Sequence, residues 1–296
     1  MNEIKPTKSI GVPTPLVDGP EKVSGKAQYS ADFMPSDYLV GRIFRSPVSH
    51  AEIINVDISA AQALPGVKAV ITGDETDETF GILPVARFEY PLARDKVRYK
   101  GEPVACVAAV DVETAQKAVD LIKFKYKELP AYFTSQEAMA EGVVNIHDHR
   151  ERNIEREVDY DLGEVDEGFE AADLVMEETF NCAEVAQSQM EPHAAIAEYD
   201  PTRDFMTIHA STQVPYYGHL MLAKVLKMEE SQIRMIKPFV GGGFGCRTEC
   251  LNVELICALV ARAAGGTVRI VISREETFIT HRGRPETDVE MKIGLT

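Results

Sequence analysis

The most distinctive local pattern in the chain is a glycine-rich loop, PFVGGGFG at residues 238–245. It follows a predicted strand at residues 233–236 and precedes a predicted helix at residues 251–263. Because glycine has no Cβ, backbone N–H groups in such a loop can approach an anionic or oxo ligand, and a helix start adds partial positive charge. A tight turn without a ligand fits the same pattern, so both interpretations stay open. A dinucleotide fingerprint and a P-loop are excluded, because neither the G-x-G-x-x-G spacing nor a following Gly-Lys-Ser/Thr is present.

Two other segments carry polar side chains that are capable of chemistry. Gln213 ends the segment STQ after a predicted strand at residues 205–210, and its amide offers a donor and an acceptor. Taken alone, Gln213 is best interpreted as a loop residue. Glu191 and His193 lie close together in the segment QMEPH and suggest acid–base chemistry or a metal. A structural turn fixed by the intervening proline is the preferred interpretation.

Sulfur and imidazole groups give weaker signals. Cys246, Cys250 and Cys257 have the spacing C-x₃-C-x₆-C, which matches no common zinc or iron–sulfur pattern. Buried core thiols are therefore the favoured interpretation, with Cys246 the least certain because it adjoins the glycine loop. His147 and His149 would form only a weak metal site, and a solvated loop is preferred there.

The charge balance limits the classes of partner. The 296 residues include 47 Asp and Glu against 31 Lys and Arg, which gives a formal net charge of −16. Nucleic acid and anionic membranes bind basic surfaces, so neither is expected as the main partner. One small basic cluster, THRGRP at residues 280–285, could hold an anionic group such as phosphate; a surface turn explains it equally well.

The chain contains no segment typical of a membrane span or a signal peptide. No apolar stretch approaches the roughly 18 residues that cross a bilayer, and the N-terminus has no apolar core. Five cysteines are an odd number for a disulfide framework. These features predict a reducing, cytoplasmic compartment.

The order of predicted elements indicates an α+β protein with two domains. Residues 1–20 are an extended lead-in, 21–135 a small α/β domain, 136–172 an acidic connection and 173–296 a second domain. The acidic connection could be a partner-docking surface, but a solvated crossing between domains is preferred. Strands are predicted at residues 38–44, 53–58, 67–72, 104–110, 123–129, 175–180, 194–199, 205–210, 233–236, 268–273 and 287–296. Helices are predicted at residues 60–64, 112–122, 220–226 and 251–263.

The last predicted strand, residues 287–296, alternates cleanly between apolar and polar side chains. No turn or partner strand follows it, and a single strand cannot satisfy its backbone hydrogen bonds alone. We therefore expect the chain to be the leading part of a larger subunit.

Taken together, these segments resemble the large molybdenum subunit of the xanthine dehydrogenase and aldehyde oxidase family. DGPEKVSGKAQYSADF, RSPVSHAEI, ALPGVKAVITG and YKGEPVACVAA resemble that family's small first domain, called the hammerhead domain. QMEPHAAIAEYD, ASTQVP and KPFVGGGFG resemble the start of its first cofactor-binding domain. The resemblance implies a hammerhead-like α/β domain followed by the first part of a molybdopterin-binding α+β domain.

Within the family, SREETFITHRGRPETDVEMKIGL and QMEPHAA resemble the 4-hydroxybenzoyl-CoA reductase type. That resemblance implies reductive dehydroxylation of 4-hydroxybenzoyl-CoA, an aryl-CoA substrate, to benzoyl-CoA. The alternatives are another molybdenum hydroxylase, acting on aldehydes, xanthine, CO or N-heterocycles, and a non-catalytic remnant or split subunit that serves as an interaction module.

The resemblance also assigns residues to the site. The family's Gln near the apical oxo ligand of molybdenum matches Gln213, and the loop that touches the molybdenum ligands and pterin matches Gly242, Gly243, Phe244 and Gly245. No residue is implied to ligate the metal directly.

Other family features are expected outside the chain. The substrate-contacting Glu of purine-oxidising relatives aligns with Thr248, which disfavours purine oxidation. The family's catalytic Glu and Arg-containing loop are expected beyond residue 296. The resemblance implies a molybdenum–molybdopterin cofactor in its cytosine dinucleotide form, and partner subunits of a hetero-oligomer that carry FAD and iron–sulfur clusters.

Overall fold

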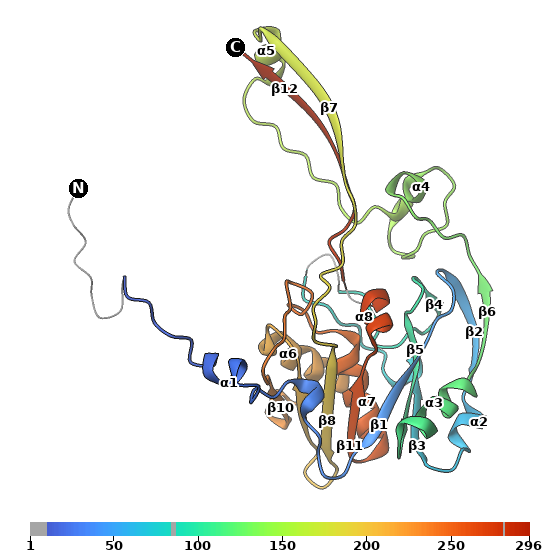
Figure 1. The fold of residues 1–296 in the computed structure, drawn as a ribbon. Coiled ribbons are helices and arrows are strands. Elements are labelled where there is room, and N and C mark those ends of the chain that lie inside the picture. Colours follow the sequence, from blue (N-terminus) through green and yellow to red (C-terminus); the bar gives the residue numbers. More distant parts are fainter. Residues whose placement is uncertain (1–10, 84–86, 281) are drawn as a thin grey trace.

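The largest element of the fold is one seven-stranded mixed sheet, seen in a computed structural model that describes residues 11–83, 87–280 and 282–296 (Figure 1). The strand order is β10-β9-β8-β11-β1-β5-β3. These strands are β1 (Leu39–Arg45), β3 (Val67–Thr72), β5 (Pro103–Ala109), β8 (Ala194–Asp200), β9 (Phe205–Ala210), β10 (Ile233–Ile236) and β11 (Thr267–Val271). The predicted α+β class is confirmed.

Strand β1 joins the two halves of the sequence within this sheet. It pairs antiparallel with β5 on one side and parallel with β11 on the other, with Leu39 opposite Val268. The ranges 21–135 and 173–296 thus both contribute strands to one continuous sheet. This arrangement sets the region after residue 173 directly against the region before residue 135.

Helices cover both faces of the sheet. Helix α7 (Asn252–Ala264) packs on one face together with α6 (Pro215–Leu226), whereas α2 (Ser59–Gln62) and α3 (Val112–Asp120) pack on the opposite face of the β1-β5-β3 half. Strand β5 is buried on both sides, which explains its uninterrupted apolar sequence. The helices therefore sandwich the centre of the sheet.

The starts of two helices follow from the residues at their first positions. The side chain of Asp111 accepts a hydrogen bond from the backbone N–H of Thr114 at 2.7 Å, as expected for the N-cap of α3. Helix α6 begins at Pro215, earlier than the predicted start at residue 220, because proline suits the first turn of a helix.

A second, three-stranded sheet lies in the N-terminal half. Its order is β4-β2-β6, with β2 (Ala51–Asp57), β4 (Lys96–Val97) and β6 (Lys123–Glu128). Its apolar side packs with the large sheet around the edge-on ring pair of Phe44 and Phe124, whose centroids are 5.9 Å apart. This small sheet completes the layered α/β unit at the start of the chain.

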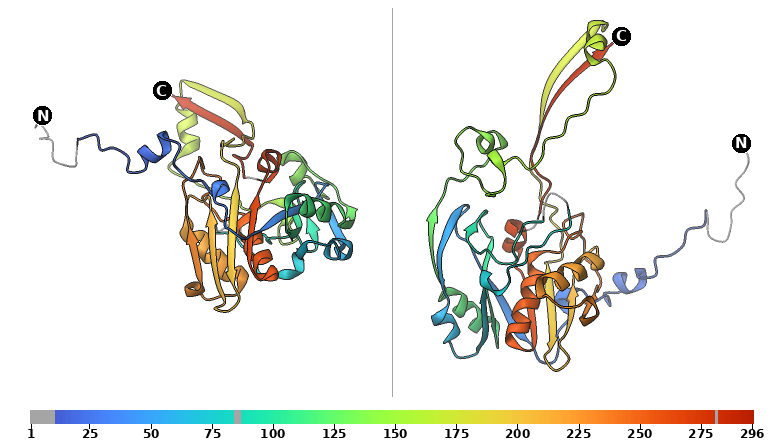
Figure 2. Two further views of the ribbon diagram at one scale, coloured as in Figure 1. Left: turned by 60° about the horizontal axis from the view of Figure 1, so that its bottom comes forward. Right: turned by 180° about the vertical axis from the view of Figure 1, so that it is seen from behind.

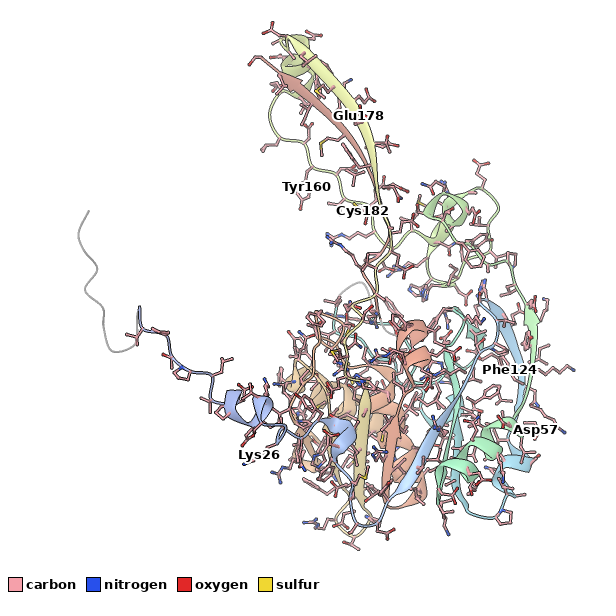
Figure 3. All side chains as sticks on the ribbon, viewed as in Figure 1. Lys26, Asp57, Phe124, Tyr160, Glu178 and Cys182 are labelled. Carbon is pink, nitrogen blue, oxygen red and sulfur yellow. The ribbon has the colours of Figure 1, made fainter. Side chains whose placement is uncertain are left out.

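Strands β7 (Leu174–Cys182) and β12 (Thr287–Leu295) form a separate two-stranded ribbon. The prediction that the last strand has no partner is wrong: β12 is antiparallel to β7 along its whole length, from Leu174 opposite Leu295 to Cys182 opposite Thr287. The ribbon projects away from the body in every view, and Figure 3 shows Glu178 and Cys182 along it (Figures 1, 2 and 3).

The acidic stretch at residues 136–172 is exposed and contains only short helical segments. Helix α5 (Val165–Glu170) packs against β12 near the free end of the β7-β12 ribbon (Figure 1). The sequence patterns did not predict α5, nor the short helices α1 (Gly19–Val23), α4 (Ser135–Met139) and α8 (Arg274–Thr280). They also did not predict the 3-10 turns η1 (Ser30–Asp32), η2 (Gly73–Glu75), η3 (Glu151–Asn153) and η4 (Glu230–Gln232). Half of the predicted lead-in, residues 1–10, lies outside the described residues.

Across the described ranges, no helix has the length and apolar character needed to cross a membrane.

Candidate functional site

The structure brings Gln213 and the glycine loop together. Gln213 lies just beyond the end of β9, and its Oε1 accepts hydrogen bonds from the backbone N–H of Gly245 at 3.1 Å and of Arg247 at 3.3 Å. The Gln213 backbone N–H in turn donates to the carbonyl of Arg247 at 2.9 Å. These bonds fix the amide orientation, because the atom that accepts from two N–H groups must be the oxygen. The Nε2 group is left as a donor, and none of the described residues accepts from it.

Glycine is required at residues 241–243 for two reasons. Neighbouring side chains lie too close for a Cβ, and the backbone adopts a conformation that favours glycine. A Cβ on Gly243 would lie 2.3 Å from Oε1 of Gln213, and one on Gly241 would lie 2.7 Å from Cβ of Glu191. Gly242 has a φ of +111°, a region that residues with a Cβ rarely adopt. The loop therefore packs against its neighbours through its bare backbone.

Consecutive backbone N–H groups of the loop are available to a ligand. Among the described residues, none accepts a hydrogen bond from the N–H of Gly242, Gly243 or Phe244. Phe244 itself has a φ of +51° and a side chain that is 74% exposed. Together with Nε2 of Gln213, these N–H groups are hydrogen-bond donors without a partner among the described residues. Such donors suit a ligand that carries an anionic or oxo group.

A buried charged network holds the loop in place. The Arg247 side chain is fully buried, and its Nη1 lies 2.5 Å from Oε2 of Glu191 and also hydrogen bonds to Oγ of Ser211. The same Glu191 oxygen accepts hydrogen bonds from Oγ of Ser211 and from the backbone N–H of Gly241, both at 2.7 Å. One carboxylate thus ties the loop, the end of β9 and the QMEPH turn together.

Sequence reasoning missed Arg247 entirely. A signal was present: Arg247 lies two residues after the glycine loop and is flanked by Cys246 and Cys250, which were predicted to be buried. A guanidinium placed there can remain buried only if it is paired.

Glu191 and His193 do not act on each other. His193 is fully buried, and its Nε2 lies 3.0 Å from Oε1 of Glu254 in α7, whereas Glu191 pairs with Arg247. The preferred interpretation of QMEPH as a structural turn agrees with this arrangement. Within the part of the chain that the structure describes, no group of three or more His, Cys, Asp or Glu side chains is placed to hold a metal ion.

Helix α7 begins at Asn252, one residue after its predicted start, and turns and bends occupy residues 246–249 between the loop and the helix. The Thr248 hydroxyl donates to the carbonyl of Gly245 at 2.8 Å. The loop is therefore shaped by local turns and by Gln213 and Glu191.

The cysteines near the loop are core residues, as predicted. Cys246, Cys250 and Cys257 are buried, and Cys257 Sγ lies 3.3 Å from the carbonyl of Val268. Burial raises the pKa of the Cys257 thiol to about 12, and it also raises the pKa of Cys246 and Cys250. Such thiols are poor nucleophiles and poor metal ligands.

The remaining candidates lie away from this site. His147 and His149 have ring centroids 5.7 Å apart. In the basic cluster at residues 280–285, residue 281 lies outside the described residues, and Arg282 is paired with Glu89 at 2.5 Å.

Family models match nearly the whole chain. Residues 24–130 match the a/b hammerhead domain of aldehyde oxidase and xanthine dehydrogenase, and residues 146–296 match the molybdopterin cofactor-binding domain. The chain belongs to the aldehyde oxidase and xanthine dehydrogenase family, so the expected domain types are confirmed.

Individual relatives agree with this assignment. The chain is 35% identical over 282 residues to the nicotinate dehydrogenase large molybdopterin subunit of Eubacterium barkeri, covering 95% of this chain and 65% of that subunit. It is 29% identical over 294 residues to the xanthine dehydrogenase molybdenum-binding subunit of Escherichia coli O157:H7, covering 94% and 38% respectively. The quinoline 2-oxidoreductase structure from Pseudomonas putida 86 matches with a TM-score of 0.90 and 30% identity over 98% of this chain and 38% of that one. The chain thus spans between about two fifths and two thirds of the length of these relatives.

Proposed function

We propose that this chain is part of a molybdenum–pterin oxidoreductase subunit and supplies one wall of its cofactor site. The observation that carries this proposal is the donor set made by the free N–H groups of Gly242, Gly243 and Phe244 with Nε2 of Gln213. When bound, the molybdopterin cofactor supplies the redox-active metal. We assign it the cytosine dinucleotide form.

The protein's contribution at this wall is electrostatic preorganisation. N–H dipoles that are fixed before the reaction stabilise negative charge on an oxo or sulfido group without any reorganisation. The bonds from Gly245 and Arg247 to Oε1 of Gln213 hold its amide in one orientation, which leaves Nε2 as the free donor. The buried pair of Arg247 and Glu191 keeps the loop rigid.

For the reaction, we propose reductive dehydroxylation of 4-hydroxybenzoyl-CoA, supported by the sequence resemblance described above. Two electrons and two protons convert this aryl-CoA into benzoyl-CoA and water. We assign the FAD and iron–sulfur clusters that deliver the electrons to partner subunits of a cytoplasmic hetero-oligomer. Thr248, in place of the Glu of purine-oxidising relatives, supports a substrate other than a purine.

A second candidate is oxidation of an N-heterocycle by the assembled enzyme. It is favoured by the names of relatives at 30% identity or more, which include nicotinate dehydrogenase and quinoline 2-oxidoreductase.

The test uses the complex that forms around the chain in its native host. An affinity tag on the chain should co-purify molybdenum and a pterin in equal amounts, measured by elemental analysis and by pterin fluorescence after release. A complex without molybdenum would overturn the proposal. A Q213A complex should retain less molybdenum, whereas Q116A, an exposed amide in α3 that bonds only to Asp120, should retain the normal amount.

Two assays on the same complex separate the substrates. Production of benzoyl-CoA from 4-hydroxybenzoyl-CoA with a reduced dye would support the aryl-CoA proposal. Oxidation of nicotinate or quinoline with an oxidised dye, and no thioester turnover, would replace it with the second candidate.

A further inference from the structure

A pocket of about 270 Å³ opens elsewhere in the molecule and shares no lining residue with Gln213 or the glycine loop. It lies where the start of β5, the segment near residue 147, the start of α7 and the end of α8 meet. Its walls combine aromatic rings with cationic groups. The lining includes Phe88, Tyr99 and His147 together with the charged residues Arg98, Glu102 and Arg282.

Arg98 is the cationic group with the least satisfied side chain. Its Nη1 donates to the carbonyl of Lys96 at 3.1 Å and lies 3.9 Å from Oε1 of Glu102. Its Nε is buried without an acceptor among the described residues, and its terminal Nη2 also donates to none of them. A guanidinium with an unused N–H is suited to a carboxylate, which it can bind through two parallel hydrogen bonds.

The carboxylates in and around the pocket do not fully pair with the Arg98 guanidinium. Arg282 is held at 2.5 Å by Glu89 and at 3.6 Å by Glu249, so those carboxylates are already engaged. Burial raises the pKa of Glu102 to about 7, with an opposing effect from Arg98, so a large fraction of Glu102 is uncharged at neutral pH.

The start of α7 adds further positive potential. Leu251 and Asn252 line the pocket, and Asn252 is the first residue of a helix that runs to Ala264. The Leu251 N–H already donates to Oε2 of Glu254 at 3.0 Å, whereas the N–H groups that follow in the first turn have no partner within the helix and carry partial positive charge. An anion in this pocket would therefore meet Arg98 and a helix N-terminus together.

Aromatic and aliphatic groups form the remaining walls. Phe88, Tyr99 and His147 contribute rings, and Ile279 contributes an aliphatic side. The volume is just below the range of about 300–1,000 Å³ that is typical of sites for drug-sized ligands. A ligand with a single planar ring matches the volume of this pocket and its aromatic walls.

We propose that this pocket binds a small aromatic monocarboxylate, with the carboxylate at Arg98 and the start of α7 and the ring between Phe88 and Tyr99. This site is independent of the proposed oxidoreductase function, because none of its residues belongs to the cofactor loop.

The test is isothermal titration of the full chain with benzoate at pH 6.5. We expect saturable one-to-one binding that weakens at least tenfold in R98M. The matched control is R203M, because Arg203 is an exposed arginine paired with Asp200 outside the pocket, and it should bind benzoate as the wild type does. Benzamide, the uncharged analogue, should bind at least tenfold more weakly than benzoate.

Further measurements test the preference for an aromatic carboxylate and the role of charge. Cyclohexanecarboxylate should bind more weakly than benzoate, and inorganic phosphate should not compete with it. Affinity for benzoate should be higher at pH 6 than at pH 8, because protonation of Glu102, whose pKa burial raises to about 7, removes negative charge beside Arg98. If circular dichroism shows that R98M is unfolded, F88A serves instead, because Phe88 is 44% exposed and contacts His149 and Arg150 only at the surface segment beside the pocket. Unchanged benzoate affinity in the folded variant, or phosphate binding in preference to benzoate, would overturn the proposal.

Discussion

Gly243 and Gln213 are in contact so close that a single added carbon would not fit between them. A Cβ on Gly243 would lie 2.3 Å from Oε1, 2.6 Å from Cδ and 2.8 Å from Cγ of Gln213. Because Oε1 also accepts hydrogen bonds from Gly245 and Arg247, the side chain cannot retreat without breaking them. The position of the amide donor and the shape of the loop are therefore set by each other.

The first prediction is that G243A destabilises the protein by about 1–3 kcal/mol, the usual cost of overpacking a site that cannot relax. Urea unfolding measures the change. Hydrogen exchange at the Gly245 and Arg247 amides should accelerate, since both donate to the displaced oxygen. The control is G266A, where an added Cβ meets nothing within 4 Å. Equal stability of G243A and G266A would contradict the inferred contact.

The second prediction concerns the buried ion pair. Replacement of Arg247 in R247M leaves the Glu191 carboxylate buried without its counter-ion, which typically costs about 3–5 kcal/mol. The double variant E191Q/R247M should recover part of this loss, because the glutamine carries no charge. Thermal unfolding of all three proteins measures the effect. The control is R203M, which removes the arginine of the exposed pair Arg203–Asp200. It should lower the free energy of unfolding by about 1 kcal/mol or less. A single variant R247M as stable as R203M would show that the network does not hold the loop.

Local pattern predicted the individual elements well. The bounds of β3, β9 and β10 agree with the sequence analysis, because alternation and turn residues determine short strands locally. The N-cap of α3 at Asp111 could also be predicted, because capping depends on residues that are neighbours in the sequence.

Pairing between distant segments could not be read from the sequence. Alternation shows that β12 has two different faces, but it does not identify β7 as its partner. The parallel pairing of β1 with β11, which fuses the two halves into one sheet, depends in the same way on tertiary packing. Residues 21–135 and 173–296 look separable by sequence for this reason.

The candidate site was partly predictable. The resemblance placed Gln213 beside the glycine loop, and the structure brings them together. It gave no reason to bury Arg247 or to pair it with Glu191, because charged residues are assigned to the surface unless a partner is known. Burial of that pair is a property of three segments that meet only in the folded chain.

The third prediction is that one of the five cysteines reacts rapidly in the folded protein. Cys182 on β7 is exposed, whereas Cys106, Cys246, Cys250 and Cys257 are buried with pKa values raised by burial. Because the thiolate is the reactive form, the buried thiols are both shielded and protonated. Mass spectrometry after brief iodoacetamide treatment at pH 8 should show a single adduct, mapped to the peptide with Cys182. The variant C182S should then give none until the chain is unfolded.

The fourth prediction follows from the buried carboxyl of Glu102, whose pKa burial raises to about 7 from an ordinary value of 4.5. The folded state therefore holds a proton that the unfolded state releases. The contribution to stability is complete below about pH 4.5 and is lost as the pH rises through 7. Relative to E102Q, the wild type should lose about 2 kcal/mol between pH 5.5 and 8.5. Urea unfolding across this range measures the difference, with E113Q, an exposed glutamate of α3, as the control that should show no such trend. A pH-independent difference between wild type and E102Q would mean that Glu102 stays ionised in the folded protein.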